Sequence, residues 1–288
     1  LFDGIEFNEE LRWIDIANDI AFLLMDLEQR GHRRFAWRFL NHYLERSGDY
    51  EGAPLLPLYK SYRAMVRAKV AAIRLAQEEA TEAEAQALRE EFLGYLEGAE
   101  TSMQRLSKPR LYITHGLSGS GKSHLCFGLR ERLGLIHLRS DVERKRLFGM
   151  EAADESHSKM EQGIYTPEAT QRTYERLAEL AETLLQGGYG VLVDATFLEH
   201  SKRDAFRRLA EKNRALFRIL AMQSPESLLR ERIRSRRRSG GDASEADLVV
   251  LEGQLRSREA FTGEEEWFVI PIDTSRPLEW EGLAERFA

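Results

Sequence analysis

The sequence predicts an α/β domain with a parallel sheet flanked by helices, preceded by an all-α helical domain. Two observations carry this prediction. From about residue 8 to residue 106 the apolar residues recur with helical periodicity, and no strand pattern follows Phe7. From residue 110 onward, short apolar runs alternate with helical stretches, as in sheets whose strands are joined by crossover helices. The polar segment 107–110 separates the two patterns, so we place the boundary between domains 1–107 and 108–288.

Four helices are expected in the first domain, over residues 13–31, 32–48, 54–80 and 81–106. Gly31 and Gly48 would end the first two, because glycine readily adopts the left-handed conformation that follows a helix. Thr81 and Glu84 have the spacing of a capping box at the start of the fourth helix.

Five strands are expected in the second domain, over residues 110–116, 135–141, 189–197, 216–224 and 267–274. Helical stretches separate all of them. Since parallel neighbours in a sheet need such crossover connections, the predicted sheet is parallel.

Composition narrows the possible functions. The chain has 288 residues, of which 42% are hydrophobic, and a net charge of −6. This charge disfavours general binding to nucleic acid or to anionic membranes, and no apolar run reaches membrane-spanning length. The single cysteine, Cys126, allows no intrachain disulfide and fits a reducing cytoplasm. The chain opens at Leu1 inside an alternating strand-like pattern, so we expect it to be part of a longer protein.

Residues 116–123, GLSGSGKS, satisfy the P-loop pattern G-x-x-x-x-G-K-[S/T] between a predicted strand and a predicted helix. The glycines let backbone N–H groups converge on phosphate oxygens, and the following helix adds its positive end. Lys122 should bridge the β- and γ-phosphates of ATP, and Ser123 should hold Mg²⁺. The predicted nucleotide contacts in this stretch are Gly116, Ser118, Gly119, Ser120, Gly121, Lys122, Ser123 and His124.

Two acidic residues follow predicted strands. Asp194 ends an apolar strand and is the expected partner of Ser123 at Mg²⁺, with a strand-end cap as the alternative. Asp141 ends another strand, where a carboxylate could take a proton from an acceptor hydroxyl. Arg144, one helical turn later, could grip an anionic group of the acceptor or the transferring phosphoryl group. The alternative is a helix-capping Asp141 paired locally with Arg144.

An arginine cluster occupies residues 230–238, with six arginines in nine positions. Gly240 and Gly241 follow it, and Asp242 or Ser244 is expected to cap the next helix. Two arginine-rich helices around a glycine hinge predict a lid that closes over ATP. A solvated basic face or an RNA contact are the alternatives. His115, His124, His137 and His157 lack the spacing of a metal site, and Thr166 is expected to cap a helix rather than to contact substrate.

Four segments together resemble the P-loop kinases of small molecules and polynucleotides that are grouped as AAA-family or zeta-toxin-like. They are GLSGSGKS (116–123), RSDVERKRLFG (139–149), VLVDATF (191–197) and RRSGGDASEADLVVLEGQ (237–254). The resemblance covers about residues 109–285. It implies that Asp141 is the general base, that Arg144 binds phosphate, and that Arg232 and Arg236 are lid arginines, with Arg236 also assisting catalysis.

Residues 1–27 resemble the C-terminal part of an aminoglycoside-phosphotransferase-like domain. The resemblance implies that Asp3 is a Mg²⁺ ligand and that the stretch around Asp19 starts a helix, as in bifunctional aminoglycoside phosphotransferase/ATP-binding proteins. This chain lacks the family's catalytic loop and its nucleotide-binding lobe. We therefore expect the front domain to be catalytically inactive.

The leading hypothesis is an ATP- and Mg²⁺-dependent kinase that phosphorylates a hydroxyl of a small-molecule or nucleotide-type acceptor. A non-catalytic ATP-binding regulator and a polynucleotide 5′-hydroxyl kinase remain as alternatives, and the net negative charge counts against the latter. The residues do not indicate which acceptor is used.

Overall fold

The computed structural model describes residues 14–76, 81–104, 108–152, 154, 163–239 and 247–287. The chain forms two compact units, Leu1–Leu40 with Gly52–Arg105, and Asn41–Glu51 with Leu106–Ala288. Residues 1–7, for which the sequence predicts a strand-like pattern and a Mg²⁺ ligand at Asp3, lie outside the described residues. Within the described residues, no helix combines the length and the apolar character needed to span a membrane.

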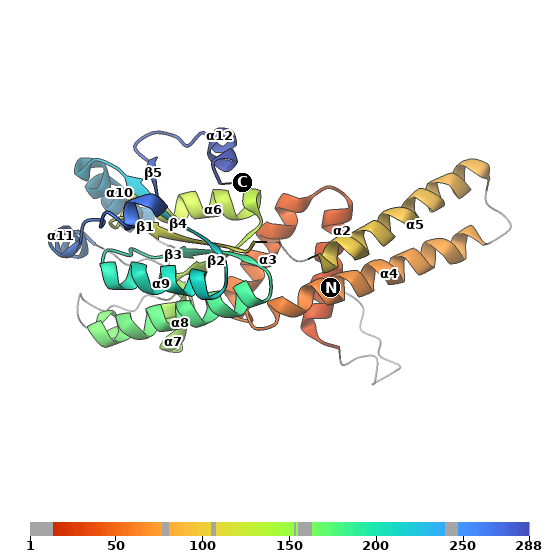
Figure 1. Cartoon of the computed structure of the whole chain (residues 1–288), viewed down its shortest axis with the longest axis horizontal. Coiled ribbons are helices and arrows are strands. Elements are labelled where there is room, and N and C mark those ends of the chain that lie inside the picture. Colours follow the sequence, from red (N-terminus) through yellow and green to blue (C-terminus); the bar gives the residue numbers. More distant parts are fainter. Residues whose placement is uncertain are drawn as a thin grey trace. The chain divides into compact units, whose positions relative to one another are not determined.

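The first unit is helical, as predicted. Its helices are α2 (Ile16–Gln29), the first part of α3 (Arg33–Ser47), the short η1 (Ala53–Leu55), α4 (Leu56–Leu75) and α5 (Glu82–Met103) (Figure 1). The capping box at the start of α5 is confirmed, because the Thr81 hydroxyl accepts from the Glu84 N–H and the Glu84 carboxylate accepts from the Thr81 N–H. Buried alanines such as Ala64, Ala68 and Ala99 form the core together with Met25 and Tyr95.

The second unit contains the predicted parallel sheet. Its strands are β1 (Arg110–His115), β2 (Leu135–Arg139), β3 (Gly190–Asp194), β4 (Leu216–Gln223) and β5 (Val269–Asp273), in the order β2-β3-β1-β4-β5. The helices of this unit are α6 (Lys122–Leu133), α7 (Ser140–Leu147), α8 (Pro167–Gln186), α9 (His200–Lys212), α10 (Glu226–Ser239), α11 (Leu248–Ser257) and α12 (Trp280–Glu285). Figure 1 shows α6 on one face of the sheet and α8 and α9 on the other. The predicted fold class is confirmed.

The strand order determines where a ligand can bind. The central strand β1 has β3 on one side and β4 on the other; the chain runs from β1 to β2 and β3 on one side and then crosses to β4 and β5 on the other. In such sheets, ligands bind outside the carboxyl ends of the strands where the order reverses. The register places Arg139 of β2 opposite Asp194 of β3. The ends of β1, β2 and β3 therefore form one continuous edge.

The second half of α3 completes the sheet at its β2 side. The buried Asn41 side chain donates through Nδ2 to the carbonyl of Leu135 (2.9 Å) and accepts from the N–H of His137 (2.7 Å). These are the two contacts that a neighbouring parallel strand would make, because residues two apart on a strand direct their polar groups to the same side. The predicted boundary near residue 108 did not anticipate that 41–51 belong to this unit.

Replacing Asn41 with leucine should lower the free energy of unfolding by about 2 kcal/mol, because both β2 groups would lose their partners in a buried place. Urea unfolding measures this loss. His42→Leu, at the exposed neighbouring position on the same helix, is the matched control and should change stability by less than about 0.5 kcal/mol. Equal effects of the two substitutions would contradict a structural role for the Asn41 side chain.

Candidate functional site

The P-loop connects the end of β1 to the start of α6. Gly119 and Gly121 have φ angles of +82° and +87°, which side chains other than glycine rarely adopt. A Cβ atom at Gly119 would lie 2.8 Å from the carbonyl oxygen of Leu229, so no side chain fits there. The hydroxyl of Thr274, just beyond β5, donates to the carbonyl of Ser120 (2.7 Å) and holds the loop from the other side. Backbone conformation thus requires glycine at both positions, and close packing requires it at Gly119 as well.

Lys122 lies in the first turn of α6, with its ammonium group turned back over the loop. Its Nζ donates to the carbonyls of Gly116 (3.0 Å) and Leu117 (2.9 Å). The positive end of α6 adds to this charge, since the first N–H groups of a helix have no partner within the helix. The loop therefore presents a concentrated positive potential suited to phosphate. His124 is exposed in the same turn, with its ring 5.8 Å from that of Trp280.

Ser123 and Asp194 are brought together from α6 and the end of β3. The Ser123 hydroxyl donates to Asp194 Oδ2 at 2.7 Å. Burial alone would raise the pKa of Asp194, but His137, Lys122 and the Ser123 hydroxyl outweigh burial and hold this pKa below its usual value. An ionised carboxylate beside a hydroxyl is a donor set of hard oxygens, which fits Mg²⁺.

The sequence interpretation did not group His137 with this site. His137 Nε2 lies 3.5 Å from Asp194 Oδ2, and Cys126 is close to both. All three are buried. Burial lowers the pKa of His137 and raises that of Cys126, so at neutral pH both groups are uncharged. Cys126 therefore serves as a core residue here, since a buried neutral thiol is a poor nucleophile.

Asp141 lies in the first turn of α7, directly after β2. Its half-buried side chain forms no hydrogen bond or ion pair with the residues that the structure describes. The alternative of a local Asp141–Arg144 pair is therefore not observed. Arg144 is buried and donates instead to the carbonyl of Ile164 (3.0 Å) and the hydroxyl of Thr170 (3.1 Å), over the ring of Tyr165. In this arrangement Arg144 fixes the start of α8.

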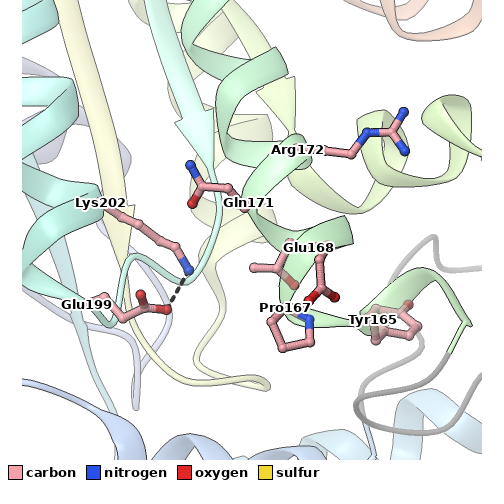
Figure 2. A pocket seen from close by; sticks show the side chains of 8 residues that line it. Tyr165, Pro167, Glu168, Gln171, Arg172, Glu199 and Lys202 are labelled. Atoms are coloured by element: carbon pink, nitrogen blue, oxygen red, sulfur yellow. Dashed lines mark hydrogen bonds and ion pairs between the residues drawn. The ribbon is translucent and has the colours of Figure 1, made fainter.

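A pocket of about 720 Å³ opens between the first turns of α8 and α9, and its lining includes Tyr165 and Thr170, which Arg144 contacts. Figure 2 shows the paired Glu199 and Lys202 facing Pro167 and Glu168 across the open space. The lining residues are Tyr165, Pro167, Glu168, Thr170, Gln171, Arg172, Glu199 and Lys202. Thr166 caps α8, as predicted, by accepting from the Ala169 N–H. The pocket itself was not predicted, because its walls come from two separate segments.

The helices α10 and α11, which the sequence predicts to form a lid, pack against the P-loop. Leu229 and Ile233 of α10 and Leu251 of α11 form a buried cluster with Leu117 and Leu198. The loop is thus covered on this side by apolar side chains of both helices.

Of the two predicted lid arginines, Arg232 reaches the P-loop. Its guanidinium donates to the carbonyl of Thr274 (2.6 Å) and, more weakly, to that of Gly119 (3.4 Å). The side chain of Arg236 lies outside the described part of the structure. The predicted cap of the next helix at Asp242 or Ser244 was wrong, since α11 begins at Leu248 and Asp247 caps it.

Comparison with known protein families finds a match within the second unit. A family model described as AAA domain matches residues 111–261, which include the P-loop, Asp141, Asp194 and Gln254. The chain belongs to this AAA-domain family. An uncharacterized protein of Mycobacterium tuberculosis (strain H37Rv) is 31% identical to this AAA-domain protein over 279 residues, 97% of this chain and 53% of the relative. The chain therefore spans about half the length of that curated relative.

The chain is also similar to one further curated protein and to two solved structures. An adenylyl-sulfate kinase of Myxococcus xanthus is 33% identical over 120 residues, 41% of this chain and 60% of that protein. A sugar kinase from Janibacter sp. HTCC2649 is 24% identical, with a TM-score of 0.46, and covers 62% of this chain and 92% of its own. A putative kinase from Chloroflexus aurantiacus is 19% identical, with a TM-score of 0.48, and covers 63% and 97%.

Proposed function

We propose that the second unit is an ATP-dependent kinase that phosphorylates a hydroxyl group of a small molecule. The observation that carries the proposal is the shared edge of the sheet. There, the P-loop lysine, the Ser123–Asp194 pair and the Asp141 carboxylate, which has no partner among the described residues, follow three adjacent strands. The similarity of 120 residues of the chain to an adenylyl-sulfate kinase supports the same reaction class.

Each group has a role in this reaction. Lys122 and the backbone N–H groups of the P-loop bind the phosphates and balance the charge that develops during transfer. Arg232, and Arg236 from the same helix, would add positive charge from the lid. Ser123 and Asp194 are the residues that would hold Mg²⁺, which when bound neutralises phosphate charge.

Asp141 acts as the general base. As the acceptor oxygen bonds to the γ-phosphorus, the hydroxyl proton passes to the Asp141 carboxylate, and the bond between the γ-phosphorus and the ADP oxygen breaks. A half-buried carboxylate with no partner among the described residues is available for this proton. Arg144 holds the neighbouring start of α8 through Ile164 and Thr170, so its role here is to position the acceptor pocket.

The pocket between α8 and α9 is the proposed acceptor site. Its charged lining groups balance, with Arg172 and Lys202 against Glu168 and Glu199, and Gln171 adds an amide. A balanced, hydrogen-bonding lining suits a neutral acceptor with several hydroxyl groups better than a polyanionic nucleic-acid end. Its volume suits a small molecule.

The Asp141→Asn variant tests the proposal. We expect acceptor-stimulated ADP release to fall by about 100-fold while nucleotide binding stays unchanged, because only the base is lost. Purified full chain would be incubated with Mg·ATP and a panel of sugar acids, polyols, nucleosides, 5′-hydroxyl oligonucleotides and an aminoglycoside. Asp204→Asn, at a surface ion pair on α9, is the matched control.

The panel also separates the alternatives. Turnover that is indifferent to every acceptor and to Asp141→Asn would contradict the kinase and favour an ATP-binding regulator. Stimulation by 5′-hydroxyl oligonucleotides alone would favour a polynucleotide kinase, and this binding should then weaken steeply with salt.

We further infer that the helical first unit derives from an aminoglycoside-phosphotransferase-like domain, on the sequence resemblance of residues 1–27 alone. A cytoplasmic location stays a prediction from the single cysteine.

A further inference from the structure

A lid side chain occupies one of the backbone donors of the P-loop. The N–H of Ser118 donates to Gln254 Oε1 of α11 at 2.8 Å, across 136 residues of sequence. The N–H groups of a P-loop are the donors that bind nucleotide phosphates. The neutral amide oxygen of Gln254 therefore holds a donor that a phosphate oxygen would otherwise take.

The position of Gln254 is fixed by the packing of its helix. Leu251, one turn earlier on α11, is fully buried in the cluster with Leu117 of the P-loop. Asp247 caps the helix by accepting from the N–H groups of Val249 and Val250. The contact is thus made by a helix that is anchored at its start and in its middle, and not by a freely moving side chain.

The second lid helix supports the same arrangement. Arg230 of α10 pairs with Glu252 of α11 and with Glu226 of its own helix, which joins the two lid helices. The carbonyl of Leu229 lies so close to Gly119 that a Cβ atom there would be 2.8 Å away. Both lid helices therefore rest directly on the loop.

The ammonium group of Lys122 is also hydrogen-bonded to carbonyls of the P-loop. Lys122 Nζ donates to the carbonyls of Gly116 and Leu117, which belong to the two successive peptides that precede Ser118. A nucleotide must therefore replace interactions at both a donor and a cation before its phosphates are fully bound. Lys122 retains its charge and can turn toward phosphate, whereas the amide oxygen of Gln254 must leave the Ser118 N–H before a phosphate oxygen can accept from it.

We propose that Gln254 is an internal competitor of nucleotide, which holds the Ser118 N–H until a phosphate oxygen displaces it. The displacement breaks the polar contact between α11 and the P-loop, so nucleotide binding and the position of the lid are coupled. The inference rests on nucleotide binding by the proposed kinase and not on transfer to an acceptor.

Two substitutions at Gln254 should act in opposite directions. Gln254→Ala removes the competing oxygen and should tighten binding of an ADP analogue by about 3- to 10-fold, the usual range for one neutral hydrogen bond. Gln254→Glu places a charged acceptor at the same N–H and repels phosphate, so it should weaken binding by at least about tenfold. Ser257→Ala, at the exposed end of the same helix, is the matched control and should leave affinity unchanged.

The measurement is a fluorescence titration of the full chain with an N-methylanthraniloyl ADP analogue and Mg²⁺, after thermal unfolding has verified that each variant is folded. Hydrogen exchange of the peptide containing Ser118 gives a second readout that needs no nucleotide. Exchange in this peptide should be faster in Gln254→Ala than in the wild type, because the amide loses its acceptor.

The outcomes separate this inference from the proposed function. Unchanged or weaker binding by Gln254→Ala, or unchanged exchange at Ser118, overturns the competitor role even if the kinase is active. Tighter binding without any acceptor-dependent turnover would support the competitor role and contradict the kinase. A wild-type chain that binds no nucleotide would overturn both.

Discussion

Replacing Arg203 with methionine should lower the free energy of unfolding of the second unit by about 3–5 kcal/mol, the usual cost of leaving one buried charge without its partner. The Arg203 side chain is fully buried, and its Nε and Nη2 donate to the two oxygens of Glu265 (2.6 and 3.0 Å). It also donates to the carbonyls of Phe197, Leu198 and Ala260. Methionine has similar bulk but satisfies none of these acceptors.

Urea unfolding at neutral pH measures the loss. Arg207→Met, one turn later on α9 at a more exposed ion pair, is the matched control and should cost less than about 1 kcal/mol. Adding Glu265→Leu to Arg203→Met should recover part of the loss, because the unpaired carboxylate is then removed. If Arg203→Met is as stable as the control Arg207→Met, the buried Arg203–Glu265 pair does not have the stabilising role assigned to it.

The Arg203–Glu265 pair should also make the free energy of unfolding depend on pH. Burial would raise the pKa of Glu265, but the hydrogen bonds from Arg203 and from the Thr262 N–H lower it to about 2, against a usual value of 4.5. A carboxyl group whose pKa is lowered in the folded state stabilises that state fully above its unfolded pKa. This contribution is lost as the pH falls from 4.5 toward 2. The stability difference between wild type and Arg203→Met should therefore narrow in this range.

The Arg203–Glu265 pair also bears on the proposed function, because it connects segments that lie near the pocket and the P-loop. Arg203 connects α9, which carries the pocket residues Glu199 and Lys202, to the segment that follows the lid helix α11. In that segment, Phe261 packs on the ring of His115, the residue before the P-loop. A weakened pair should therefore loosen the pocket, the lid and the P-loop together.

Replacing Lys122 with methionine should reduce acceptor-stimulated turnover by about 10³-fold or more, because the variant loses the cation that stabilises charge on the transferred phosphoryl group. Nucleotide affinity should fall as well. Turnover and a nucleotide titration on the same preparation measure the two effects. Stability should also fall, since the carbonyls of the buried residues Gly116 and Leu117 lose their donor.

Lys202→Met is the matched control for the loss of a lysine. Lys202 lines the proposed acceptor pocket and not the P-loop, so its loss should raise the KM for the acceptor and leave nucleotide affinity unchanged. Wild-type nucleotide affinity in Lys122→Met would mean that nucleotide does not bind at the P-loop, and it would contradict the proposed function at its first step.

Sequence patterns alone predicted the elements that depend on near neighbours in the chain. The helical periodicity before residue 106, the five strands, and the capping box of Thr81 and Glu84 all have local causes, and the structure confirms them. The P-loop was predicted for the same reason, because its glycines and Lys122 act within eight residues. Asp141 and Asp194 were selected as strand-end carboxylates, and their catalytic roles stay predictions.

The tertiary structure decided every contact between distant segments. Asn41 lies 94 residues from the strand that it completes, Arg203 lies 62 residues from Glu265, and Gln254 lies 136 residues from Ser118. No periodicity or motif marks such pairs, because each partner has an ordinary local setting and meets the other only when the sheet and its helices pack. The pocket between α8 and α9 depends in the same way on these two helices lying side by side. The sequence by itself therefore determined the elements and the phosphate-binding motif, whereas the packing of the elements decided which side chains surround that motif.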